Sequence, residues 1–204
     1  MSIVSQYILI KGGAKVEVND VLHALGLTDY VPEKDVMLYE TNKAKTLFIG
    51  QYNDVLIITH PDLPFDFFAE KQSETERKLI QLFPTNEIAV LLENEQVGAF
   101  GYAIIEQGVK VRMKDGADGE FYNDYGSLLP EELIMQGEIL RGEIMPEDEI
   151  EELREDMSEE EVTKHIEFEA CWRTPGLIAK RYFDGQTLNN MLGSDTKVTR
   201  FIKQ

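Results

Sequence analysis

Two apolar runs that follow each other closely constrain the fold of this chain most. Thr46–Tyr52 and Val55–His60 are rich in β-branched and aromatic residues, which favour strands. Asn53-Asp54 separates them and has the residue types of a tight turn, so we expect an antiparallel hairpin. A sheet built around this hairpin is therefore the first expectation for the chain.

The segments on either side alternate between strand and helix patterns. In chain order, the sequence predicts a strand over Ile3–Lys11, a short helix ended by Gly26, the hairpin, a helix over Gln72–Phe83 and a strand over Glu87–Leu92. This order is that of a ferredoxin-like fold, in which two helices cover one face of an antiparallel sheet. Asp29–Lys45 is polar and is predicted mostly as loop. We therefore expect an α+β protein with a mainly antiparallel sheet.

A further hairpin extends this sheet. Val97–Glu106 and Val109–Lys114 are predicted strands joined at Gln107-Gly108, a favoured two-residue turn. The stretch after them, "VRMKDGADGEFYNDYG", gathers four carboxylates between Asp115 and Asp124. No register places them at the ligand positions of an EF-hand loop. The two Asp-Gly pairs favour turns, so we predict a short returning strand over Glu120–Asn123 and leave an irregular cation site open.

The chain changes character after this sheet region. We divide it into an α+β sheet domain over 1–127 and an acidic, mainly helical extension over 128–204 that packs on the same domain. Pro146–Glu169 is the most acidic part, and its apolar positions have helical spacing. Ser158 and Glu161 form a capping box for a second helix there. Short helical pieces are predicted over Gly176–Phe183 and Gln186–Leu192, and no strand is predicted after Asn123.

The formal net charge of −18 limits the partners of this protein. A strongly acidic chain without a basic patch repels phosphate backbones and anionic membranes, so no nucleic acid and no membrane is expected as a partner. The acidic helical surface over Pro146–Glu169 suits a basic protein partner. The alternative is that these charges only form a solvated surface that keeps the protein soluble.

Cysteine use and the N-terminus indicate the compartment. Cys171 is the single cysteine, so no internal disulfide forms, and it is expected as a small buried apolar residue. The first residues lack the basic and apolar regions of a signal peptide, and no apolar run reaches the roughly 20 residues that span a bilayer. We expect a cytoplasmic protein that uses no cofactor.

One stretch offers candidate catalytic residues. In "THPDLPFDFF", His60, Asp62 and Asp66 follow the end of a predicted strand, where sites often form. Histidine with carboxylates can perform acid-base chemistry or bind a metal, whose identity the sequence leaves unknown. The same residues beside Pro61 and Pro64 are also ordinary turn chemistry. These three residues are the predicted catalytic site if the protein is an enzyme.

Three segments between Phe48 and Glu132 share a pattern with known sequences. They are the strand pair "LFIGQYNDVLIITH", the aromatic strand "AFGYAIIEQGVKVRM" and the turn leading to "YNDYGSLLPEE". In these the chain resembles an uncharacterised family of bacterial proteins of unknown function. The resemblance implies a bacterial cytoplasmic protein and carries over no catalytic residue.

Two functions from different classes follow from these observations. The leading hypothesis is a non-catalytic binding protein that acts through its acidic helical surface. The alternative is a small metal-dependent or hydrolase-like enzyme with its site at His60, Asp62 and Asp66. An exposed edge of the antiparallel sheet could also support a homodimer.

Overall fold

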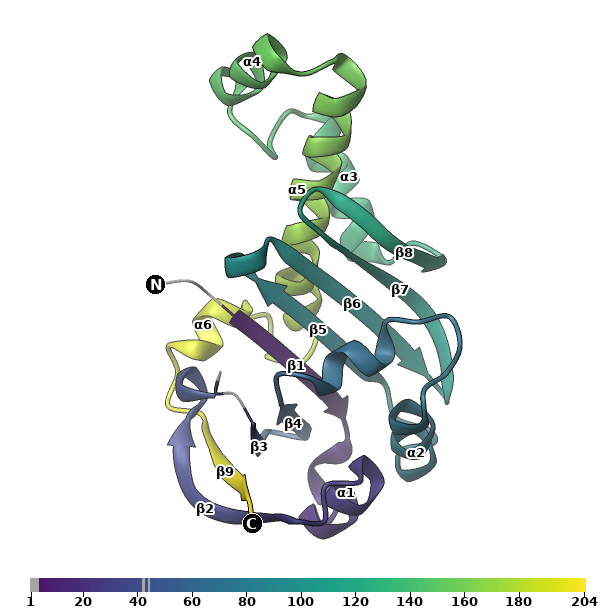
Figure 1. The fold of residues 1–204 in the computed structure, drawn as a ribbon, viewed down its shortest axis with the longest axis vertical. Helices are drawn as coiled ribbons and strands as arrows, with labels where there is room; N and C mark the ends of the chain where they lie inside the picture. Colours follow the sequence, from purple (N-terminus) through teal and green to yellow (C-terminus); the bar gives the residue numbers. More distant parts are fainter. Residues whose placement is uncertain (1–3, 42, 44) are drawn as a thin grey trace.

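The computed structural model describes residues 4–41, 43 and 45–204, except the side chains of residues 188 and 189. This part of the chain forms a nine-stranded sheet and six α-helices (Figure 1). The strands are β1 (Val4–Lys11), β2 (Tyr30–Met37), β3 (Thr46–Tyr52), β4 (Val55–Thr59), β5 (Ile88–Asn94), β6 (Ala99–Glu106), β7 (Val109–Ala117), β8 (Glu120–Gly126) and β9 (Lys197–Lys203). The helices are α1 (Val18–Leu25), α2 (Glu74–Leu82), α3 (Pro130–Leu140), α4 (Glu147–Asp156), α5 (Glu159–Ala179) and α6 (Leu188–Leu192).

The sheet is antiparallel at every neighbouring pair of strands, in the order β2-β9-β3-β4-β1-β5-β6-β7-β8. The mixed α+β class and the antiparallel sheet are thus confirmed. The predicted hairpin is β3–β4, in which Tyr52 pairs with Val55 across the turn. Ile3, the predicted first strand residue, lies outside the described residues. The ferredoxin-like description of the start stays a prediction.

Two strands were missed by the sequence prediction. Asp29–Lys45 was expected as loop, but Tyr30–Met37 forms β2, the strand at one edge of the sheet. Its middle four residues are exposed, so the apolar alternation typical of a strand is absent there. The end of the chain forms β9, which lies between β2 and β3 and buries Val198 and Phe201. The mostly loop prediction for 29–45 was therefore wrong, because long-range pairing decides both strands.

The acidic stretch after β6 is a long hairpin with one turn instead of two. β7 continues through Asp115-Gly116, and the chain turns only at Asp118-Gly119, where both φ angles are positive. A Cβ on Gly116 would lie 2.4 Å from the carbonyl oxygen of Glu120. Glycine is present there because the two strands approach closely, so the prediction of a turn at Asp115-Gly116 was wrong.

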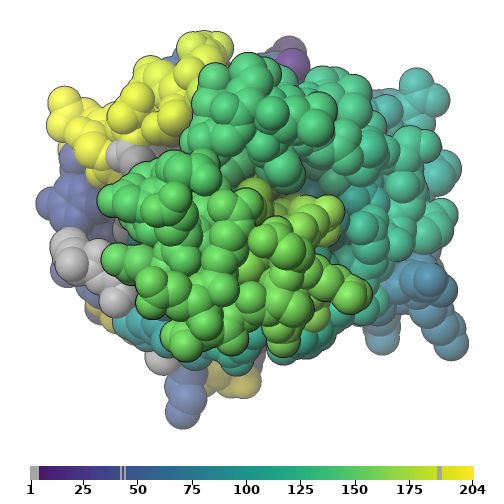
Figure 2. Space-filling model, turned by 90° about the horizontal axis from the view of Figure 1, so that it is seen from above, coloured from purple at the N-terminus to yellow at the C-terminus, as the bar shows by residue number. Residues whose placement is uncertain are grey.

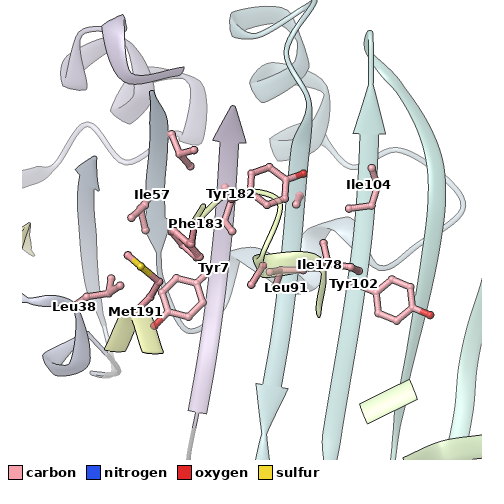
Figure 3. Packing of buried hydrophobic residues seen from close by; sticks show 14 of the residues in the cluster. Tyr7, Leu38, Ile57, Leu91, Tyr102, Ile104, Ile178, Tyr182, Phe183 and Met191 are labelled. Carbon is pink, nitrogen blue, oxygen red and sulfur yellow. The ribbon is translucent and has the colours of Figure 1, made fainter. Parts of the chain in front are cut away.

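The core lies on both faces of the sheet, because alternate residues of each central strand point in opposite directions. In β1, Tyr7 belongs to one buried cluster and Ile8 to the other. The cluster of Ile8 packs against α1 and α2, and the cluster of Tyr7 packs against α5 and α6. Figure 3 shows the second cluster, in which Ile178 and Phe183 from the C-terminal part lie among sheet residues. Residues after 127 thus cover one face of the sheet.

The helix α5 runs across the boundary between the sheet and the acidic part. It is one helix of 21 residues with Pro175 inside it, where the sequence predicted separate pieces. Its start has the predicted capping box of Ser158 and Glu161. Figure 1 shows that α4 and the first turns of α5 project away from the sheet. We call residues 146–169 the acidic arm.

Candidate functional site

The three residues predicted as a catalytic site lie between the end of β4 and the start of α2. His60 is 8% exposed and its ring lies edge-on to Tyr30. Its Nδ1 accepts a hydrogen bond from the backbone N–H of Asp62, whereas the Asp66 carboxylate accepts one from the hydroxyl of Thr75. Burial lowers the pKa of His60, and the charge of Asp62 opposes that shift. The hydrogen bond from Thr75 thus ties Asp66 to α2. The shared catalytic role of His60, Asp62 and Asp66 stays a prediction.

Three of the four carboxylates that suggested a cation loop interact with donors of the protein itself. Asp115 accepts a hydrogen bond from the side-chain amide of Asn123 at 2.8 Å, and Glu120 lies 2.6 Å from the Lys164 ammonium. Asp124 forms ion pairs with two cations of β7. Within the described residues, no group of three or more histidine, cysteine or acidic side chains has the geometry to hold a metal ion.

The acidic arm contains a groove between its two helices. Twelve acidic and two basic residues lie in residues 146–169, so the arm holds a large part of the net charge of −18. A hollow of about 410 Å³, here called the arm groove, is lined by Met145, Leu153, Met157 and His165 together with three carboxylates. The carboxylates are Glu149, Glu152 and Asp156, which share one face of α4 with Leu153. An apolar floor with an acidic rim is the result.

Each helix of the arm buries an apolar residue. Ile150 of α4 and Val162 of α5 are buried, at 7% and 2% exposure, so each helix presents its apolar side to the rest of the protein. Arg154 lies 3.4 Å from Glu147 and 3.3 Å from Glu159, and all three side chains are exposed. Figure 2 looks onto the arm from above and shows that it stands in front of the sheet domain. The groove therefore faces solvent on a projecting element.

A second charged cluster, which the sequence did not flag, lies inside the protein. The guanidinium of Arg112, whose side chain is 1% exposed, donates two hydrogen bonds to Glu132 at 2.8 and 2.6 Å and one to Asp124. Glu132 also accepts from the hydroxyl of Tyr102 and from the backbone N–H of Leu129 at the start of α3. We call this cluster the Arg112 network. It connects β6, β7, β8 and α3.

The charges of the Arg112 network are balanced once Lys114, which lies 3.1 Å from Asp124, is counted with it. Burial lowers the pKa of Arg112, but hydrogen bonds to Glu132 and Asp124 outweigh this and raise it. Burial raises the pKa of Asp124, and its hydrogen bonds to Arg112 and Lys114 bring it below the ordinary value. Burial and the Glu132 carboxylate raise the pKa of Tyr102. Both carboxylates already accept hydrogen bonds from donors of the protein, so neither is free to act as an acid or base. The network instead connects α3 to the sheet.

A small pocket opens beside this network, between α3, α5 and β8. Its volume is about 220 Å³, and its lining includes Lys114, Cys171 and Glu167 together with apolar side chains of Leu128, Met135 and Ile139. We call it the edge pocket. Burial raises the pKa of the Cys171 thiol, although the neighbouring Lys114 opposes the shift. Cys171 is therefore a thiol near neutral pH, which does not favour a nucleophilic role.

A weak signal for the Arg112 network exists in the sequence. "VKVRMKD" alternates apolar with basic residues inside a predicted strand, which predicts that its three cations share one face. In the structure a bulge at Val111 turns Lys110 to the opposite face from Arg112. The partner carboxylates, Asp124 and Glu132, lie 12 and 20 residues away along the chain. Their pairing depends on the β7–β8 register and on where α3 packs, neither of which the local pattern contains.

In comparisons with protein-family models, curated proteins and solved structures, no match to this chain was found. The resemblance of Phe48–Glu132 to a bacterial family stays a prediction. Within the part of the chain that is described, no helix is both long enough and apolar enough to cross a bilayer.

Proposed function

We propose that this protein is a non-catalytic binding protein whose acidic arm takes up a basic protein partner. The observation that carries the proposal is the arm groove, whose apolar floor of Met145, Leu153 and Met157 is rimmed by three carboxylates of α4. Basic side chains with long apolar stems, or an amphipathic basic helix, match both features of such a groove.

The charge distribution supports a basic occupant. Of the arm carboxylates, Glu147 and Glu159 share the single cation Arg154, and the groove carboxylates Glu149 and Glu152 have no ion pair among the described residues. Clustered, unpaired charge of one sign accelerates association with an oppositely charged partner and makes binding depend on salt. The apolar floor adds the burial that charge alone does not supply, since exposed ion pairs contribute little.

The enzyme alternative rests on fewer observations. His60 is buried and its Nδ1 is occupied by a backbone N–H, while Asp66 accepts a hydrogen bond from Thr75. Acid-base catalysis by these residues requires a substrate to reach both of them. A binding role therefore accounts for more of the molecule than a hydrolase-like site does.

The proposal is tested with a neutralised arm groove. The variant Glu149→Gln/Glu152→Gln/Asp156→Asn removes three charges from the rim and keeps the side-chain shapes. The control Asp20→Asn/Asp54→Asn/Glu70→Gln removes the same charge from exposed positions elsewhere. Proteins that crosslink to the full chain in cells are identified by mass spectrometry. Each basic candidate is then purified and titrated against all three forms.

We expect one basic protein to bind the wild type and the control with similar affinity. The groove variant should bind it at least about tenfold more weakly, since several charge contacts are lost together. Binding that is equal in all three forms, or weakened equally in both variants, would show that the arm groove is not the site. A catalytic activity lost in His60→Ala would replace the proposal with the enzyme alternative.

A further inference from the structure

The two edges of the sheet are protected to different degrees. β2 carries Pro32, which has no N–H, and the exposed charges Glu33, Lys34 and Asp35, with a bulge between Pro32 and Lys34. Proline, charge and bulges are the features that prevent other strands from pairing with an edge. β8, at the opposite edge, contains neither proline nor lysine. Its one irregularity in the pairing with β7 is a bulge at Tyr122. The carbonyls of Tyr125 and Gly126 accept hydrogen bonds from Arg112, so the part of β8 before Tyr125 is the segment left for pairing with another strand.

Exposed large apolar side chains are frequent in the segment from β8 to α3. They belong to β8, to α3 and to the segment between them, and they are Tyr122, Tyr125, Leu128, Leu133, Ile134 and Leu140, with exposures from 44% to 88%. These are six of the eleven large apolar residues exposed in the described part of the chain, gathered within 19 residues of sequence. Apolar surface that is concentrated in this way is typical of an interaction site.

The edge pocket opens within the same region and is small. Its volume of about 220 Å³ is below the range of roughly 300–1,000 Å³ of small-molecule sites, so it suits a single long side chain. Leu128 and Ile139 line it with apolar surface, and Gln136 and Glu167 are exposed lining residues. Within the described residues, Glu167 has no ion pair. The positive charge of Lys114 in the pocket is balanced by Asp124 at 3.1 Å.

Charge decides which occupant fits this edge. Residues 115–143 contain eight acidic residues and one basic residue, but five of the acidic residues already form ion pairs within the protein. Among the described residues, Asp118, Glu138 and the pocket residue Glu167 have no ion pair. A second copy of this chain would bring a further net charge of −18, which opposes self-association. A strand with basic side chains meets complementary charge instead. Its Lys or Arg could lay the stem against Leu128 and direct its cation to Glu167.

We propose that β8 takes up an extended, basic segment of a protein partner as a tenth strand, with one Lys or Arg side chain of that segment in the edge pocket. This mode is β-strand addition, in which main-chain hydrogen bonds give affinity and pockets for alternate side chains give specificity. The proposal rests on the proposed function in expecting a basic protein partner, but it uses a surface distinct from the arm groove.

The test uses a labelled peptide of alternating valine and arginine with the length of β8, 7 residues. Its analogue, N-methylated on every backbone amide, has the same charge but has no N–H group with which to pair with a strand edge. We expect the wild type to bind the peptide at least about tenfold more tightly than the analogue. Hydrogen exchange of the β8 amides should slow on binding, while the amides of β2 stay unchanged.

The binding of a Lys or Arg side chain in the edge pocket is tested with Glu167→Lys, which reverses the charge of this lining residue. Glu160→Lys makes the same change in net charge in the first turn of the same helix, at a residue that does not line the edge pocket. We expect Glu167→Lys to weaken peptide binding about tenfold and Glu160→Lys to leave it within about twofold. Equal effects of the two variants, equal binding of peptide and analogue, or sedimentation as a dimer would overturn the proposal.

The experiments can reject either proposal independently of the other. If neutralising Glu149, Glu152 and Asp156 abolishes partner binding while Glu167→Lys has no effect on partner or peptide, the arm groove is the site and the strand addition is wrong. If the β8 amides are protected by the peptide and the arm variant binds its partner normally, the edge is the site and the arm proposal is wrong.

Discussion

Carboxylates are used differently in the Arg112 network and in the acidic arm. Glu132 is buried, with a side-chain exposure of 6%, and every contact it makes comes from a donor of the protein. Glu147 and Glu159 are exposed by 73% and 79% and share one arginine at distances above 3.2 Å. A buried charge requires paired, hydrogen-bonded partners, whereas an exposed one is stabilised by water. The comparison predicts where a lost carboxylate matters for stability.

The largest effect is expected from Glu132→Ala. This change leaves the buried guanidinium of Arg112 with Asp124 as its remaining acidic partner and removes the acceptor of Tyr102. Breaking a buried ion pair from one side destabilises a protein by about 3–5 kcal/mol. Urea unfolding should show a loss of that size. A loss below about 1 kcal/mol would mean that the network is far more hydrated than its burial indicates.

A double variant sharpens this first prediction. Arg112→Met/Glu132→Leu removes both charges together and replaces them with apolar side chains. Replacing a whole buried pair is much less harmful than breaking it, so the double variant should recover part of the stability that Glu132→Ala loses. If the double variant lost as much stability as Arg112→Met and Glu132→Leu lose in sum, Arg112 and Glu132 would not be energetically coupled.

The next effect concerns Glu93, a half-buried carboxylate that has no ion pair among the described residues and whose charge depends on pH. Its side chain lies beside Gly176, next to Pro175 inside α5. Burial first, and then the charge of Glu95, raise the pKa of Glu93 to about 7, while the backbone N–H of Gly176 opposes the shift. A carboxyl whose pKa is raised in the folded state stabilises the fold at low pH. That stability is lost as the pH rises from about 4.5 through about 7.

Glu93→Gln should therefore remove part of the pH dependence. Above pH 7 the variant should be more stable than the wild type, on the order of 2–3 kcal/mol, and the difference should vanish below pH 4.5. Thermal unfolding of both forms across this range measures it, and subtracting the two profiles removes the opposing contribution of His60. A difference that does not change with pH would show that Glu93 is ionised at no extra cost.

A smaller effect is expected from Tyr102→Phe. The hydroxyl donates a hydrogen bond of 2.8 Å to Glu132, which keeps its two bonds from Arg112 in the variant. Loss of one such bond with the charges still paired costs about 1 kcal/mol. Chemical denaturation should place this variant clearly between the wild type and Glu132→Ala. A loss as large as that of Glu132→Ala would mean that Tyr102 holds the network together.

The smallest effect is expected from Arg154→Ala in the arm. Its ion pairs with Glu147 and Glu159 are exposed, and such pairs contribute below about 1 kcal/mol. The variant should unfold almost as the wild type does at high salt, where exposed pairs are screened. If its loss of stability approached that of Glu132→Ala, the proposed difference between the two regions would not hold.

The sequence by itself determined much of the sheet and its helices. Strong alternation and turn residues placed the β3–β4 hairpin, and the spacing of Leu79, Ile80 and Leu82 before Pro84 placed α2. Ser158 and Glu161 marked the start of α5. These elements are encoded locally, since each depends on residues only a few positions apart.

The tertiary structure alone decided β2, β9 and the sites. β2 and β9 are strands because each pairs with the other, and the paired residues Asp35 and Thr199 are 164 residues apart along the chain. A bulge at Val111 directs Lys110 to Glu76 on one face of the sheet and Arg112 to Glu132 on the other, although both are basic residues of one strand. Burial then separates the carboxylate of Glu132 from those of the arm. The amino-acid composition does not distinguish these two kinds of carboxylate. Their desolvation depends on surroundings that only the folded chain creates.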